Sequence, residues 1–369
     1  MTERITLHQV VERLAENGIA YYIMPLAGSA QVVVSQRGGR IFGPFLSPDA
    51  PGILWLNPAF ATRVAFRAFL AAHNWNLGGD RIWIGPEVQY NFRDRQDPWG
   101  SYYLPSQMDP GSYVLEVDGA GGCRLHQDLT LSAYNLASGE KELRIERAIR
   151  HVADPLRQLS AYPAVSAGLT FAGYQQKVYL KESRRDAIMS ETWNLTQVVQ
   201  GGAALVPASP CAQITDYRDP VDEGTLARRA GHLQVRMARG HQYKLGVQAT
   251  HVTGRFGYVR WLDDGRACLI VRSFYNNPSA GYAEEPPQSP GRRGHSIHLY
   301  NDDGVLGEFG EIECQGQTIG GATGRSASHD PFVTWVYAGP WNSICQVAEH
   351  LLRLELDENT RSALAPAGA

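Results

Sequence analysis

Short runs of alternating apolar and polar residues, separated by Gly, Pro, Asn and Asp, dominate this chain of 369 residues. Such runs predict β-strands, because successive side chains on a strand point to opposite faces. The clearest examples are residues 31–34, 113–117, 129–134, 143–149, 176–180, 233–237, 243–247, 267–274, 297–300 and 333–337. The pattern favours a mostly β protein in which two large sheets pack together.

Helical spacing of apolar residues is found at residues 5–17, 59–72 and 341–354. The first of these segments ends at Asn17-Gly18, a typical helix stop signal. Pro and Gly are frequent in residues 277–294, which we interpret as a long loop within one domain rather than as a linker. We therefore expect an N-terminal helix within residues 1–20, one β domain over residues 21–356 and a flexible tail over residues 357–369.

Composition excludes several classes of protein. Apolar residues make up 43% of the chain and charged residues 19%, which is enough for a packed core. The net charge of −3 gives no electrostatic reason to expect nucleic acid or a membrane as partner. Five scattered cysteines without a CxxC pair argue against a disulfide framework. Glu12, Arg13 and Glu16 interrupt the first apolar segment, so we expect no signal peptide or membrane span and a cytoplasmic location.

A carboxylate on a late strand is the most informative candidate for chemistry. In residues 307–315, alternation places Ile312 and Cys314 on one face and Glu311 and Glu313 on the other. If Ile312 and Cys314 point into the core, Glu313 points into a solvent-facing concavity. A carboxylate held there by a rigid strand can act as a general base, although an ordinary exposed carboxylate gives the same pattern.

Three arginines raise a similar question about their partners. Arg81 and Trp83 share one face of a predicted strand, which suits a sugar ring or, equally, a structural ion pair or cation–π contact. Arg147 and Arg272 each lie on an apolar strand face and need either a carboxylate or a ligand there. A structural partner is the simpler explanation for both.

Metal and cofactor signals are weak. His295 and His298 are three residues apart, so on a regular strand they face opposite ways and are not expected to share a metal. The Gly doublets lack the strand and helix context of a nucleotide-binding loop. We expect neither a metal nor an organic cofactor.

The segment GGDRIWIGPE at residues 78–87 resembles the GG-(D/E/H)-R-(F/L)-W-x-x-PE signature of a family of galactose-mutarotase-like proteins. Further similar segments follow in order at residues 129–152, 191–197, 296–303 and 309–314. The resemblance covers roughly residues 30–355. It implies a β-supersandwich, a large curved antiparallel assembly that binds a sugar on its concave side.

The resemblance also implies chemistry. In aldose mutarotases a glutamate in an L-E-x-Q strand removes the anomeric proton, and histidines supply the acid. The segment IECQ at residues 312–315 matches that strand, so Glu313 is the implied base. Leu77 stands where those enzymes have the histidine of H-G-G, and no histidine accompanies Trp193-Asn194-Leu195. Candidates for the missing acid are His298, Tyr300, Lys244 and Arg81.

These observations lead to one set of expectations. The catalytic residues are Glu313 and His298, and the substrate-binding residues are Arg81, Trp83, Glu87, Asn194, Arg147, Arg272 and Tyr300. The partner is a carbohydrate, and the reaction is interconversion of the anomers of an aldose or a sugar derivative. Sugar elimination or hydrolysis on the same scaffold is the second hypothesis. A sugar sensor without catalysis is the third, and the missing histidines favour it.

Overall fold

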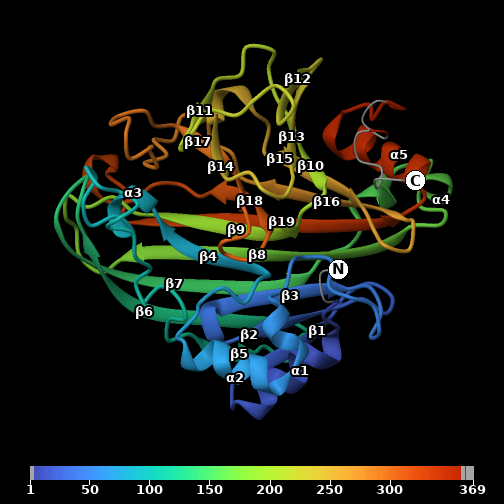
Figure 1. Cartoon of the computed structure of the whole chain (residues 1–369), viewed down its shortest axis with the longest axis horizontal. Coiled ribbons are helices and arrows are strands. Elements are labelled where there is room, and N and C mark those ends of the chain that lie inside the picture. Colours follow the sequence, from blue (N-terminus) through green and yellow to red (C-terminus); the bar gives the residue numbers. More distant parts are fainter. Residues whose placement is uncertain (1–3, 359–361, 363–369) are drawn as a thin grey trace.

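A computed structural model describes residues 4–358 and 362 and contains two large antiparallel sheets (Figure 1). The expected tail at residues 357–369 lies outside the described residues except for 357, 358 and 362, and the expected division into domains stays a prediction. No helix in the described part of the chain is long and apolar enough to cross a membrane.

The first sheet has nine strands, and it carries the site described below. They are β1 (Tyr21–Pro25), β2 (Gln31–Ser35), β3 (Arg40–Phe45), β4 (Asp80–Gly85), β9 (Glu191–Val199), β11 (Ile214–Asp216), β14 (Tyr243–Gln248), β17 (His295–Asn301) and β18 (Phe309–Gln315). Their spatial order is β1-β2-β3-β4-β9-β18-β17-β14-β11. Strands that are distant in sequence are thus neighbours at the centre of this sheet.

The second sheet has ten strands. They are β5 (Val114–Val117), β6 (Cys123–Ala133), β7 (Gly139–His151), β8 (Thr170–Glu182), β10 (Gly202–Pro207), β12 (Leu226–Arg229), β13 (His232–Met237), β15 (Arg255–Trp261), β16 (Ala267–Phe274) and β19 (Ala327–Gly339). Their order is β12-β13-β10-β15-β16-β19-β8-β7-β6-β5. Each run of alternating residues named above overlaps one of the strands of the two sheets, so the prediction of a mostly β fold is confirmed.

The three expected helical segments are also confirmed. The α-helices are α1 (Leu7–Glu16), α2 (Arg63–Ala71), α3 (Glu87–Tyr90), α4 (Tyr162–Val165) and α5 (Trp341–Leu352). The 3-10 helices are η1 (Arg37–Gly39), η2 (Pro58–Ala61), η3 (Pro155–Gln158), η4 (Ala249–His251) and η5 (Gly321–Thr323). The segment at residues 59–72 is divided between η2 and α2, because the Thr62 side chain caps α2 by accepting from the Ala65 N–H.

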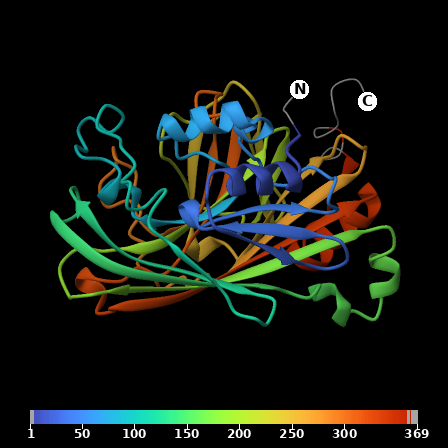
Figure 2. The ribbon, with the colours of Figure 1, turned by 90° about the horizontal axis from the view of Figure 1, so that it is seen from below.

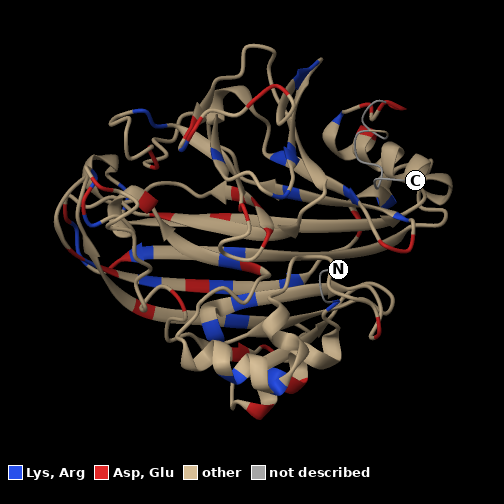
Figure 3. Cartoon of the chain, in the orientation of Figure 1, with Lys and Arg blue, Asp and Glu red and all other residues tan. Residues whose placement is uncertain are grey.

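Apolar packing forms three layers. A large core of buried residues from both sheets fills the space between them. Helices α1 and α2 cover β2 and β3, whereas α5 covers β10, β15, β16 and β19 on the outside of the ten-stranded sheet (Figure 2). Charged residues of both signs are interspersed along the strands (Figure 3), which agrees with the small net charge.

A buried polar network ties the two sheets together at Asp80, the first residue of β4. Its carboxylate accepts hydrogen bonds from the Tyr174 hydroxyl at 2.8 Å, Gln176 Nε2 at 2.9 Å and Asn194 Nδ2 at 2.5 Å, and Arg272 Nη1 lies 3.2 Å away. All five side chains are buried. These contacts identify the inner face of β4 and β9, which leaves the neighbouring residues on those strands pointing outward.

The glycine pair before β4 makes a close backbone approach. Gly78 and Gly79 have φ of 92° and 80°, a region that favours glycine. A Cβ on Gly78 would lie 2.4 Å from the Trp55 carbonyl oxygen, and one on Gly79 would lie 2.5 Å from that of Ile41. The pair therefore fixes the start of β4 and with it the position of Arg81.

Candidate functional site

Four residues form a row across the outer face of the nine-stranded sheet. Arg81 on β4 and Glu313 on β18 are both directly opposite Leu195 on β9, and Glu313 is also opposite His298 on β17. Directly opposed residues of antiparallel strands share a face. Arg81 and Glu313 are two strand spacings apart, about 10 Å. As predicted, Ile312 is buried and, by alternation, points the other way.

The expectation that Arg81 and Glu313 open to solvent is wrong. Glu313 is 0% exposed and Arg81 1% exposed. Two loops bury this face, one between α3 and β5 and one between β16 and β17. The first supplies Tyr102, whose pKa is raised well above its usual range by burial and by the nearby Glu87 carboxylate. The second supplies Glu284, whose carboxylate accepts a hydrogen bond from the Glu87 backbone N–H.

Lys244 on β14 stands among several carboxylates. Its Nζ lies 2.6 Å from Glu87 Oε2 and 3.9 Å from Glu313 Oε2, and 4.4 Å from the centre of the Trp193 ring. Burial lowers the pKa of Lys244, but the carboxylates of Glu87, Glu313 and Glu284 outweigh burial, so its pKa is raised. The side chain is therefore a fixed positive charge within the cluster.

The two oxygens of Glu313 have different surroundings. Trp193 Nε1 donates a hydrogen bond of 2.7 Å to Oε2, whereas Oε1 is buried without a hydrogen-bond partner among the described residues. Burial raises the pKa of Glu313 to about 7, with Lys244 opposing the shift and Glu311 adding to it. A carboxyl group with this pKa can both accept and release a proton near neutral pH.

Arg81 makes the structural contacts that its sequence position allowed. Its Nη2 donates to Glu311 Oε1 at 2.8 Å, and its guanidinium carbon lies 4.1 Å from the centre of the Trp83 ring and 5.3 Å from that of Trp75. Trp83 Nε1 in turn donates to Asp109 Oδ2 at 3.1 Å. Arg81 Nε and Nη1 have no hydrogen-bond partner in the described part of the chain, so they retain donors for a ligand.

His295 and His298 do not face opposite ways, which corrects the prediction from spacing. The pairing of β17 with β14 skips Ser296, so a β-bulge turns both imidazoles to the same side. His298 Nε2 and His295 Nδ1 each lie 3.0 Å from the Tyr217 hydroxyl. Gly246 on β14 makes room for this contact, because a Cβ there would lie 2.7 Å from the Tyr217 ring and 2.9 Å from the His295 ring.

Both imidazoles are held neutral. Burial, Lys244 and His295 lower the pKa of His298 well below its usual range, and burial and Arg292 lower that of His295 to about 4.

Among residues 4–358, no group of three or more His, Cys, Asp or Glu side chains is arranged to hold a metal. The prediction that the two histidines share no metal remains untested.

Three of the expected substrate-binding residues lie in the inter-sheet layer, away from this cluster. Asn194 and Arg272 belong to the Asp80 network, so a structural carboxylate is indeed the partner of Arg272. Arg147 donates from Nε to Gln176 Oε1 at 3.1 Å and from Nη1 to the Gly39 carbonyl. The physical reason is alternation: these side chains leave their strands on the inner face.

Tyr300 and Glu87, by contrast, remain at the outer face. The Tyr300 hydroxyl accepts from Gln242 Nε2 at 2.8 Å and donates to Asp302 Oδ1 at 3.3 Å, which places it at the margin of the cluster. Glu87 binds Lys244. The sequence did not indicate that Tyr217 and Glu284 belong to this site, or that Glu311 is the ion-pair partner of Arg81. Glu311 could have been found, because it is two residues from Glu313 and so shares its face.

Residues 10–363 match DUF6786, which is described as a family of unknown function. The chain belongs to this family. No curated protein matches the DUF6786 chain.

Solved structures are similar to the DUF6786 chain in fold. One, from Escherichia coli K12 and provisionally assigned as an aldose 1-epimerase, has a TM-score of 0.53 at 12% identity and covers 86% of this chain and 99% of its own. A galactose mutarotase-like protein from Lactobacillus casei has a TM-score of 0.48 at 8% identity, covering 86% and 100%. At such identity the first likeness shows the fold, and the predicted mutarotase-like β architecture of the DUF6786 chain is confirmed.

Proposed function

We propose that the cluster around Glu313 binds a sugar and interconverts its anomers, with Glu313 as the proton acceptor. The observation that carries this proposal is the state of Glu313: its pKa is near 7, Trp193 holds one oxygen, and the other oxygen has no partner among the described residues. The provisional assignment of the E. coli structure as an aldose 1-epimerase supports the same class of reaction.

In this reaction Glu313 removes the proton of the anomeric hydroxyl, the bond between C1 and the ring oxygen breaks, and the ring oxygen takes up a proton. Rotation about the C1–C2 bond of the open aldehyde and reversal of these steps give the other anomer, so protons balance. We assign the proton donor to Glu284. Burial raises its pKa well above its usual range, against the opposing charge of Lys244, which favours the protonated form that a donor needs.

His298 is a poorer donor than Glu284, because its lowered pKa leaves it without the extra proton. The rings of Trp83 and Trp193 meet edge to face with their centres 5.6 Å apart, so they give the cluster an apolar wall. The free donors of Arg81 suit its hydroxyl groups. Glu87 has a supporting role, since it fixes Lys244 beside Glu313.

The test follows the anomers of freshly dissolved aldoses by proton NMR, with binding measured in parallel by calorimetry. We expect Glu313→Gln to retain the fold and sugar binding, because an amide can still accept the Trp193 hydrogen bond. Its rate should fall by about two to four orders of magnitude, the usual contribution of a general base. Glu308→Gln, an exposed carboxylate next to β18, is the matched control and should keep the full rate.

Three outcomes would change the assignment. A full rate in Glu313→Gln would remove Glu313 as the base. Sugar binding without any acceleration by the native protein would favour the sensor hypothesis. New sugar products in the spectra, in place of anomer exchange, would favour elimination or hydrolysis.

A further inference from the structure

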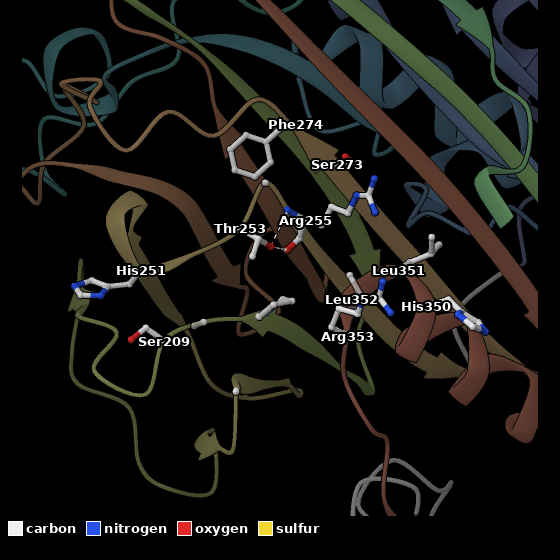
Figure 4. Close-up of a pocket in the computed structure, with 14 residues that line it drawn as sticks. Ser209, His251, Thr253, Arg255, Ser273, Phe274, His350, Leu351, Leu352 and Arg353 are labelled. Atoms are coloured by element: carbon white, nitrogen blue, oxygen red, sulfur yellow. Dashed lines mark hydrogen bonds between the residues drawn. The ribbon is translucent and has the colours of Figure 1, made fainter. Parts of the chain in front are cut away.

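A surface cavity of about 580 Å³ lies between the C-terminal turn of α5 and the ends of β10, β15 and β16 (Figure 4). Its lining includes His350 from α5, Arg353 at the C-cap of α5, Arg255 from β15 and His251 from η4. None of its lining residues belongs to the cluster described above. The volume falls within the range of ordinary small-molecule sites.

The fixed charges of this cavity are all positive. Arg255 and Arg353 line it together with His251 and His350, and no Asp or Glu of the described residues does. Neither arginine forms an ion pair with a carboxylate in the described part of the chain, although salt bridges involve many other arginines here. The guanidinium of Arg255 lies 5.2 Å from the centre of the Trp335 ring, which supports it without neutralising it.

The remaining lining is suited to an organic molecule. The hydroxyls of Ser209, Thr253 and Ser273 add hydrogen-bonding groups, and Phe274 and Leu352 form an apolar wall. The carboxyl end of α5 contributes about half a negative charge, which two full guanidinium charges exceed. The site is therefore positive and partly apolar, and none of the described residues that line it is a carboxylate.

We propose that this cavity binds a small organic phosphate ester. Guanidinium groups present paired N–H donors that match phosphate oxygens, and they do so better than ammonium groups. The phosphate lies between Arg255 and Arg353, and the organic part of the ester rests on Phe274 and Leu352. Because the site is separate from the Glu313 cluster, the proposal does not depend on the sugar reaction.

The test is calorimetry of the full chain with adenosine 5′-monophosphate, with adenosine and inorganic phosphate as partial ligands. Arg353→Gly is the sharpest variant: Arg353 has φ of 59° at the end of α5, where glycine is the favoured residue, so the change removes the charge and keeps the helix end. Arg255→Gln is the second variant. Arg124→Gln, in a separate cavity that also holds Glu146 and Asp330, is the matched control.

We expect the monophosphate to bind more tightly than adenosine or phosphate, and each site variant to weaken it by about tenfold or more, the usual effect of losing a charged hydrogen bond. Arg124→Gln should leave the affinity unchanged. Thermal melting shows whether each variant is folded. If Arg255→Gln does not fold, Arg353→Gly alone tests the proposal. The proposal is overturned if the native chain does not bind the monophosphate, if adenosine binds equally well, or if Arg353→Gly binds with native affinity.

Discussion

The Lys244 ammonium lies 3.9 Å from the Glu313 carboxylate, in a part of the molecule closed to solvent. The cluster around this pair holds two cations and four carboxyl groups, all buried except the partly buried Glu87: Lys244, Arg81, Glu87, Glu284, Glu311 and Glu313. Full ionisation would leave two negative charges uncompensated among these six groups, and burial of unpaired charge is costly. Protons on Glu284 and, below about pH 7, on Glu313 relieve this excess.

Removal of the Lys244 charge should destabilise the fold. In Lys244→Met, Glu87 and Glu313 lose their cation, and we expect the free energy of unfolding to fall by about 3 to 5 kcal/mol. Loss of the cation raises the folded-state pKa of Glu313 and Glu284 further above the unfolded value. Their stabilising contribution is then present at low pH and lost as pH rises, so the deficit should be larger at pH 8 than at pH 5. Urea titrations of both proteins at the two pH values measure it; an equal deficit at both would contradict this coupling.

The anomer-exchange rate should depend on pH through Glu313. A base acts when deprotonated, and the pKa of Glu313 is raised to about 7, so kcat/KM should rise with pH through about 7 and fall again at the higher pH where Glu284 loses its proton. For an exposed glutamate the midpoint of this rise would lie near pH 4.3. Initial rates in buffers of constant ionic strength give the profile. A flat profile between pH 5 and 9 would assign the rate to another group.

Arg95 should hold the two covering loops together. Its Nη2 donates to the Pro286 carbonyl at 2.8 Å and its Nε to that of Pro287 at 2.5 Å, and Nη1 pairs with Glu285. In Arg95→Ala we expect backbone amides of residues 284–294 to exchange hydrogen about tenfold faster, as local opening becomes easier. Arg93→Ala, on the same loop, is the control, because Arg93 lies over the Tyr103 ring instead. Equal hydrogen exchange rates in both variants would show that Arg95 does not hold the two loops together.

Arg272 should matter for stability and leave sugar binding unchanged. Arg272→Met leaves the buried Asp80 carboxylate without its cation, and we expect the free energy of unfolding to fall by about 3 to 5 kcal/mol. Arg266→Met breaks an exposed pair with Asp264 and should cost less than about 1 kcal/mol. Calorimetry on the folded variant tests the binding. Loss of sugar affinity without loss of stability would restore Arg272 as a ligand contact.

The sequence predicted the strands, the three main helices and the faces that Glu311 shares with Glu313 and Arg81 shares with Trp83, because all of these depend on local periodicity. Burial of Glu313 was missed, since the covering loops follow no period and supply Tyr102 and Glu284 from distant positions. The orientation of His295 depended on one skipped residue in the pairing of β17, a property of two strands together. The partner of Arg272 was likewise unreadable, because Asp80 belongs to the other sheet.

The row that joins Arg81, Leu195, Glu313 and His298 depends on the register of the strands. Deleting one residue early in β18 would exchange its two faces, sending Glu313 toward the Asp80 network and placing Cys314 beside Lys244. Single substitutions in this strand change one contact, whereas a one-residue insertion or deletion scrambles the whole site. Length changes among members of the family should therefore gather in the connecting loops and spare β4, β9, β18 and β17.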